Sequence, residues 1–388
     1  MKWAPRTMGT LLLSATAGIA CGMDSDVSDD PYDELEPSAD DMELDDAPRA
    51  ACGFPVGTHP ALQCSNATWT PQDKTFKITD NVTFGGNNNI EGFCWNIPPA
   101  IKTLVIQGGK TLTGCLRMQT PMTIKGSTTN RSATIFGTDT TQWAVSRGIP
   151  DTEKWKYSGI SVRWDAPAGA YKVKNLTIEN ARTYGVTAYN QRLVGDNIHI
   201  LHTRGDNDDK SNSDGFGGGP NSVLRNSRVD VMDDSVKLYK NNMLVKNVTI
   251  VHRGNGAPFQ LGWGNAGTTT ATIDNVLVLD QENEFNLGLF SASNGSYTRN
   301  VVIKGLAAKY TTSPADKVWN GSWQSLPLFF MKSGGAQLNL TAGTSPNVDI
   351  KAPIGKRGPG SVSASGLCGS NGIKKSYKCG QAVTGCGW

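Results

Sequence analysis

The sequence predicts an all-β protein whose body is one parallel β-helix, and three observations lead to this fold class. A short strand-like phrase that begins with Asn recurs between residues 172 and 304. Glycine is abundant, with 44 of 388 residues, and charged residues make up only 18% of the chain. The repeat contains no stretch with the apolar spacing of an amphipathic helix. The recurring phrases are Asn175–Ile178, Asn197–Ile200, Asn226–Val229, Asn247–Ile250, Asn275–Val278 and Asn300–Ile303.

Each phrase is a predicted strand with one apolar and one polar face, because apolar residues alternate within it. Successive Asn residues are 22, 29, 21, 28 and 25 positions apart. A period of this size with one strand phrase indicates a solenoid, whose coils stack at about 4.8 Å through strand hydrogen bonds. We expect the Asn side chains to point inward at the coil bends and to hydrogen-bond from coil to coil. A β-propeller needs longer repeats, and the strands of a β-sandwich are less periodic.

The amino-terminal part of the chain predicts export. Residues 1–21 have the basic start and short apolar stretch of a signal peptide, which is too short to span a membrane. The stretch ends at Gly18–Cys21, which resembles a bacterial lipobox and predicts lipidation of Cys21. The alternative is ordinary cleavage and secretion. Residues 22–50 are acidic and nearly without aromatic residues, so we expect a disordered linker or a propeptide.

Charge and cysteine usage differ between the two parts of the chain. The net charge is +3, but the first 50 residues hold twelve acids and three bases, so the remaining 338 residues carry a formal charge of +12. Seven of the eight cysteines lie in this body, near its two ends, and the spacing and the four histidines disfavour a structural zinc site. We therefore expect disulfides. The predicted parts are a disulfide-tied cap at 51–100, a β-helical catalytic domain at 101–335, and a Gly/Ser/Cys-rich segment at 336–388.

Three carboxylates are the candidate catalytic residues. Asp214 and Asp233 are 19 residues apart, close to one repeat, which predicts neighbouring coils. Val229 and Val231 alternate in one phase, whereas Val236 and Leu238 alternate in the other. The strand must therefore bend or bulge between them, which would let Asp233 and Asp234 both reach the surface.

Three carboxylates in one groove suit glycoside hydrolysis. One protonated carboxyl donates to the leaving oxygen, and one ionised carboxylate activates water. Crowding of like charges raises the pKa of one of them, as a general acid requires. A solvated acidic turn and a Ca²⁺ site are the alternatives. We expect no metal and no cofactor.

These residues resemble glycoside hydrolase family 49, the family of dextranase and isopullulanase, over about residues 160–310. The resemblance lies in Asn212–Gly215, in Asp233–Tyr239 and in Phe259–Trp263. It implies a right-handed parallel β-helix and inverting endo-hydrolysis of α-glucans such as dextran or pullulan. In that case Asp233 is the best candidate for the general acid, and Asp214 and Asp234 activate the water. The amino-terminal β-sandwich that is usual in the family has no room in this chain.

Six further residues are candidates for substrate binding, and several functions stay open beside the hydrolase. The candidates are Asn212, Lys237, Tyr239, Gln260, Trp263 and Arg204. A polygalacturonase-like hydrolase is the nearest rival, and the +12 body favours its anionic substrate electrostatically. A polysaccharide-binding β-helix without activity and a Ca²⁺-dependent lyase are the others. We expect a secreted or lipid-anchored monomer at the bacterial cell surface, with polysaccharide as partner, no nucleic acid, and membrane contact only through the anchor.

Overall fold

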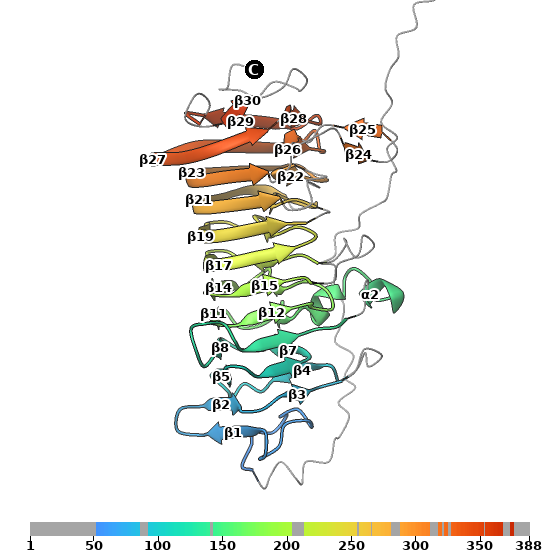
Figure 1. Ribbon diagram of the computed structural model, residues 1–388, viewed down its shortest axis with the longest axis vertical. Coiled ribbons are helices and arrows are strands. Elements are labelled where there is room, and N and C mark those ends of the chain that lie inside the picture. The colour runs from blue at the N-terminus through green and yellow to red at the C-terminus, as the bar shows by residue number, and fades with distance from the viewer. Residues whose placement is uncertain are drawn as a thin grey trace, which may run out of the picture.

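The computed structural model describes residues 52–85, 92–139, 143–203, 213–253, 256–264, 266–280, 288–310, 317–319, 322–324, 327–352, 354–367 and 373–375. This part of the chain is nearly all β and its strands are mainly parallel, which confirms the predicted all-β class. Figure 1 shows successive strands stacked along the longest axis of the molecule. The arrangement is consistent with a parallel β-helix.

Most strands belong to two sheets. The first sheet contains β1 (Ala67–Thr70), β2 (Thr75–Ile78), β3 (Val82–Thr83), β5 (Thr103–Ile106), β6 (Thr111–Thr113), β8 (Thr123–Gly126), β9 (Thr134–Phe136), β11 (Ala170–Lys174), β12 (Thr177–Glu179), β14 (Arg192–Asp196), β15 (His199–Leu201), β17 (Val223–Val231), β19 (Met243–His252), β21 (Gly267–Asp280), β23 (Tyr297–Tyr310), β27 (Ala336–Ala352), β29 (Ser361–Ser365) and β30 (Ile373–Lys375). The second sheet contains β4 (Cys94–Ile97), β7 (Cys115–Met118), β10 (Ile160–Val162), β13 (Val186–Ala188), β16 (Phe216–Gly218), β18 (Val236–Lys237), β20 (Phe259–Gln260), β22 (Phe290–Ala292), β26 (Pro327–Met331) and β28 (Ile354–Arg357). A separate antiparallel pair is formed by β24 (Lys317–Trp319) and β25 (Ser322–Gln324).

The chain visits the two sheets in turn, and each pass adds one layer to the stack. In the second sheet, Val186 lies opposite Phe216, Phe216 opposite Val236, and Val236 opposite Phe259. The next rings, Phe290 and Phe329, continue this buried row and stack on one another. Equivalent residues of successive layers therefore share one face, which allows residues far apart in sequence to form one site.

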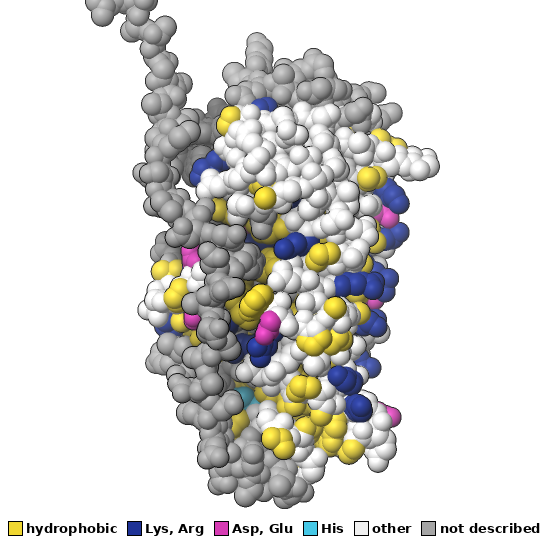
Figure 2. Space-filling view, turned by 180° about the vertical axis from the view of Figure 1, so that it is seen from behind, with side chains coloured by type: hydrophobic (Ala, Val, Ile, Leu, Met, Phe, Trp, Pro, Cys, Tyr) yellow, Lys and Arg dark blue, Asp and Glu magenta, His cyan; other side chains and the backbone are white. Residues whose placement is uncertain are grey.

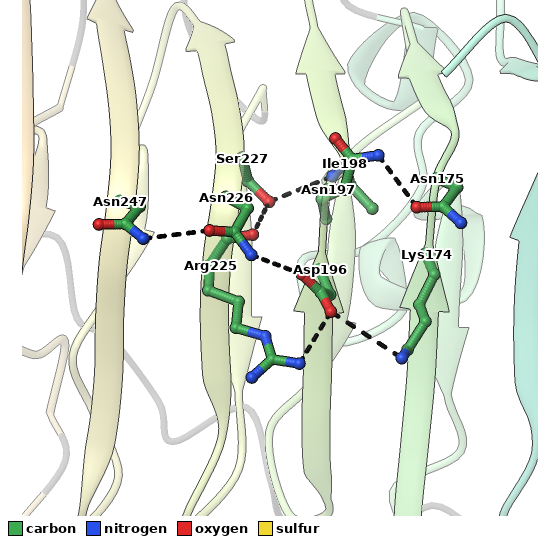
Figure 3. Close-up of polar contacts among 9 residues, drawn as sticks. All are labelled: Lys174, Asn175, Asp196, Asn197, Ile198, Arg225, Asn226, Ser227 and Asn247. Carbon is green, nitrogen blue, oxygen red and sulfur yellow. Dashed lines mark hydrogen bonds and ion pairs between the residues drawn. The ribbon is translucent and has the colours of Figure 1, made fainter. Parts of the chain in front are cut away.

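The Asn repeat builds a ladder, as expected, but on the outside of the bend. Asn197 donates to Asn175, Asn247 to Asn226, and Asn275 to Asn247, with Nδ2–Oδ1 distances of 2.9, 3.1 and 2.9 Å. Asn226 instead donates to Asp196, as Figure 3 shows. These five Asn residues have φ between 51° and 56°, the left-handed conformation that Asn tolerates better than most residues.

Two expectations about the ladder are wrong. Asn226, Asn247 and Asn275 are exposed, because the left-handed turn directs their side chains away from the core. The last phrase is also out of register, since Asn300 lies opposite Thr270 and receives a hydrogen bond from Asn339. The backbone of Gly305, instead, lies against Asn275.

A short excursion between β9 and β10 carries the helix α2 (Trp143–Ser146) and the 3₁₀ turn η1 (Lys154–Tyr157). Trp143 and Tyr157 pack on one another, and the buried guanidinium of Arg182 lies over the ring of Trp143. Thr183 donates to the carbonyl of Lys154. Burial lowers the pKa of Arg182 to about 9. Arg182 therefore ties the excursion to the stack and does not line an open groove.

Disulfides join Cys52 to Cys64 and Cys94 to Cys115. Disulfides are typical of an oxidising compartment. Cys21 and the three cysteines of the carboxyl-terminal segment, Cys368, Cys379 and Cys386, lie outside the described residues. None of the described helices has the length and hydropathy needed to cross a membrane.

Candidate functional site

A break in the strand positions the carboxylates. β17 ends at Val231 and β18 begins at Val236, and both valines are fully buried. The chain bends between them, as the change of phase predicts. Asp234 stands two residues before Val236. Phe216 lies opposite Val236 in the neighbouring strand, and Asp214 stands two residues before Phe216. The two carboxylates therefore lie on adjacent layers.

The three predicted carboxylates form one cluster. One oxygen from each of Asp214, Asp233 and Asp234 lies within 4.8 Å of the others. Asp214 and Asp234 are buried, with 5% and 3% exposure, and Asp233 is partly exposed. The expectation that Asp233 and Asp234 both reach the surface is thus wrong for Asp234, because the bend turns its side chain into the stack. Asp233 is the member of the pair that faces solvent.

Backbone and side-chain donors orient the two consecutive acids. Oδ1 of Asp233 accepts the backbone N–H of Asp234 at 2.9 Å. Oδ1 of Asp234 accepts the N–H of Ala257 at 3.1 Å and Nε2 of Gln260 at 3.4 Å. Gly256 has φ +67°, and a Cβ there would lie 2.4 Å from Oδ1 of Asp233 and 2.6 Å from Oδ1 of Asp234. The left-handed backbone and the missing side chain make room for both carboxylates.

Lys237 is the cation of the cluster. Its Nζ lies 2.9 Å from Oδ2 of Asp214 and 4.0 Å from Oδ2 of Asp234. The same ammonium lies 5.1 and 5.6 Å from the ring centroids of Tyr184 and Tyr239. Burial opposes its charge, but Asp214, Tyr189, Tyr239 and Asp234 together outweigh burial and raise the pKa of Lys237 well above its usual value. The site therefore holds a fixed positive charge.

The pKa of Asp234 lies well above the usual value of an aspartate. Burial raises the pKa of Asp234 to about 7, and the negative charge of Asp214 acts in the same direction. Lys237 and the hydrogen bonds from Ala257 and Gln260 oppose the rise. A carboxyl that keeps its proton near neutral pH beside an ion-paired carboxylate is the combination of groups found in acid/base sites.

The structure describes four of the six residues predicted to bind substrate. Lys237 and Gln260 contact the carboxylates, and Gln260 is fully buried. Trp263 is 47% exposed, so it is a surface ring and not part of the core. Tyr239 is buried and stacks on Tyr189. Asn212 and Arg204 lie outside the described residues.

Sequence reasoning missed two tyrosines beside the cluster and an exposed tryptophan farther along the same sheet. Tyr184 stands two residues before Val186. Asp214 and Asp234 stand at the equivalent position of the next two strands, two residues before Phe216 and Val236. Tyr189 stands three residues after Val186, as Tyr239 does after Val236. Trp164, which follows β10, is 54% exposed. Aligning the strands of the second sheet, and not only the Asn phrases, would have found the two tyrosines.

His252 lies just behind the carboxylates. It is fully buried at the end of β19, and its Nδ1 lies 3.4 Å from Oγ of Ser235, the residue after Asp234.

A divalent cation in the cluster would have to share Asp214 with the ammonium of Lys237, which repels it. The arrangement therefore suits proton transfer better than metal binding.

Comparisons with known proteins give no assignment. No protein-family model matches the chain, and a search of curated proteins finds no match.

Proposed function

We propose that this protein is an exported glycoside hydrolase with a right-handed parallel β-helix, and that its substrate is an α-glucan similar to dextran or pullulan. The observation that carries the proposal is the cluster of Asp214, Asp233 and Asp234 around Lys237, with one carboxyl that holds its proton near pH 7. A binding protein has no need of such a group.

The proposed roles follow from exposure and charge. Asp214, paired with Lys237, is the ionised base that removes a proton from the attacking water. Asp233 faces solvent and donates the proton to the glycosidic oxygen. Asp234 holds this proton in the resting enzyme, passes it to Asp233 and is left ionised, which differs from the water-activating role that the family resemblance implies. The bond between the anomeric carbon and the glycosidic oxygen breaks while water adds to that carbon, with the inversion that the family resemblance implies. One oxygen of each carboxylate lies within 4.8 Å of the others, which is closer than the about 6.5–9.5 Å usual for inverting enzymes, so the anomeric form of the product decides this part of the proposal.

Aromatic rings at the end of the second sheet supply contacts for the polymer. Trp164 and Trp263 follow strands β10 and β20, which lie at the two ends of a run of five adjacent strands. Tyr189 and Tyr239 lie between them in this order. Adjacent strands are about 4.8 Å apart, so the exposed rings are separated by roughly 19 Å along the stack. This length suits several sugar units and therefore an endo-acting enzyme.

Two further parts of the proposal concern location. The amino-terminal sequence and the disulfides support secretion, with lipidation at Cys21 as the anchor to the cell envelope. We propose a monomer whose partner is the polysaccharide.

Product analysis with matched variants tests the proposal. The wild type and the variants Asp214→Asn, Asp233→Asn and Asp234→Asn are incubated with dextran, pullulan and polygalacturonate, and products are separated by chromatography. We expect oligosaccharides from an α-glucan and a loss of about 10²–10⁴-fold in each variant. Asp274→Asn removes an acid from a surface ion pair with Lys246 and serves as the control. Absence of any new reducing end from all three polymers contradicts the proposal.

A further inference from the structure

A second charged feature lies on the first sheet, away from the carboxylate cluster. Along this sheet, one row contains Lys77, Val105, Lys125, Lys174, Asp196, Arg225, Lys246 and Asp274, each opposite the next. Lys304 follows Ile303, the partner of Ile273, and so takes the next place in the row. These nine positions span about 38 Å at a strand spacing of about 4.8 Å.

The row is strongly basic. It has six bases and two acids, and Arg225, Lys246 and Lys304 are exposed. Lys174 and Arg225 share the single carboxylate of Asp196, at 3.9 and 2.9 Å. Partial burial opposes ionisation of Asp196, but the hydrogen bonds from Arg225 and Asn226 outweigh it and hold its pKa below the usual value. Asp196 is therefore a fixed anion that neutralises one of its two cations.

Three bases of the row keep their full charge for another partner. Lys246 pairs with Asp274 at 2.8 Å. Lys77, Lys125 and Lys304, in contrast, make no ion pair with any described residue. The row therefore presents a net charge of +4 in single file along the stack.

The figures show the surroundings of the row. In Figure 3 the side chains of Lys174, Asp196 and Arg225 lie together beside the Asn ladder. In Figure 2 Lys and Arg side chains recur along one edge of the molecule with few acidic side chains among them. The row belongs to strands of the first sheet, whereas Asp214 and Asp234 directly precede β16 and β18 of the second sheet, so the row and the cluster lie on different parts of each layer.

We propose that this basic row, Lys77 to Lys304, binds a linear acidic polysaccharide that lies along the stack. A polymer with a charge on each sugar meets successive layers with successive charges, and six of the nine layers present a base to it. A membrane surface would instead favour bases spread in two dimensions. Single-stranded nucleic acid would favour aromatic rings for base stacking, and the row contains none. The protein would thus hold an anionic polymer on one face while the carboxylate cluster acts on another.

Charge-matched variants test this inference without reference to catalysis. Lys77→Gln, Lys125→Gln and Lys304→Gln are combined, since these bases have no ion pair to lose. The control combines Lys156→Gln, Arg163→Gln and Lys332→Gln, which remove the same net charge away from the row. Lys156 and Arg163 also leave the surface acids Glu153 and Asp165 without their ion pairs, so this control overstates any effect of net charge alone. Binding to polygalacturonate is measured at increasing salt for the wild type and both variants, with dextran as the neutral polymer and anionic phospholipid vesicles as the membrane probe.

The expected result is a loss of at least about tenfold in affinity for polygalacturonate in the row variant, which is about 1.4 kcal/mol. The control should lose less than about twofold, and the affinity of the wild type should fall as salt screens the charges. Equal losses in the two variants overturn the inference, as does no binding by the wild type. Tighter binding to vesicles than to the polymer, lost in the row variant, assigns the row to a membrane surface and also overturns it. Activity on dextran that is unchanged in the row variant separates this inference from the proposed hydrolysis.

Discussion

Replacing Asp234 by asparagine should remove most of the dependence of stability on pH that this buried carboxyl creates. Burial raises the pKa of Asp234 from 3.8 to about 7 in the folded protein. Between these values the folded state binds more protons than the unfolded state. The group therefore contributes its full stability below the unfolded pKa and loses it as pH rises through the folded pKa. Asparagine has the shape of the protonated acid and no proton to lose.

The shift sets the size of the effect. About three pH units at about 1.4 kcal/mol each give an upper limit of about 4 kcal/mol. The pKa of about 7 already includes the attraction of the Lys237 ammonium, which lies 4.0 Å away, so we expect about 2–4 kcal/mol with that limit as the ceiling. At about pH 8 the variant should therefore be more stable than the wild type by this amount, whereas at about pH 4 the two should be nearly equal.

Guanidinium unfolding at these two pH values measures the difference. Circular dichroism and tryptophan fluorescence should be followed together, because coincident transitions justify a single free energy of unfolding. Asp274→Asn, at the surface, provides the control for loss of a carboxyl. A variant that is destabilised equally at both pH values would show that Asp234 is an ordinary ionised carboxylate, and it would refute the reasoning.

Three further predictions concern the same site. Lys237→Met removes the cation that lowers the pKa of Asp234, so the alkaline limb of the pH profile of kcat/KM should move to higher pH from about pH 7. Lys237→Arg should keep the limb at its wild-type position. An unmoved limb in Lys237→Met would show that the two groups are not coupled. Gly256→Ala places a Cβ against both carboxylates at a φ of +67°, so activity should fall by at least about tenfold and stability by about 1–2 kcal/mol. Gly264→Ala, at a φ of +85° with open space around it, is the control and should lose stability alone. Equal activity in the two alanine variants would contradict this prediction. Trp263→Ala should raise KM for the polymer by about 2–10-fold, from a loss of about 0.5–1.5 kcal/mol of ring contact. It should leave the unfolding midpoint unchanged because the ring is 47% exposed. Val56→Ala, at 86% exposure, is the control, and an unchanged KM in Trp263→Ala would show that Trp263 does not bind the polymer.

Local pattern was enough to predict where the carboxylates meet. The spacing of Asp214 and Asp233 matches one repeat, and the change of phase between Val231 and Val236 marks the bend. The pattern could not show which side chain turns inward. Asp234 is buried because Ala257 and Gln260, from the next layer, supply its hydrogen bonds. Those partners depend on how the layers stack.

The contacts of Lys237 show a second limit. Strand alternation correctly directs Lys237 away from the core, but its long side chain reaches back to Asp214 on the neighbouring layer.

The Asn ladder shows a third limit of prediction from the sequence. The repeat of Asn was a reliable sign of stacking, yet the left-handed φ that puts these side chains outside is a property of the turn and not of the period. In the next layer the ladder position falls on Gly305 and not on an Asn, so Asn300 lies outside the ladder.

The most direct test of the proposed hydrolytic centre is the anomeric form of the first product, followed by proton NMR while the wild type and Asp233→Asn act on the α-glucan that the wild type cleaves. The proposed roles predict a new reducing end of inverted configuration in the wild type and none in the variant, with Asp274→Asn behaving as the wild type. Full activity in Asp233→Asn, in a protein that unfolds at the same denaturant concentration as the wild type, would contradict the assignment of the three carboxylates.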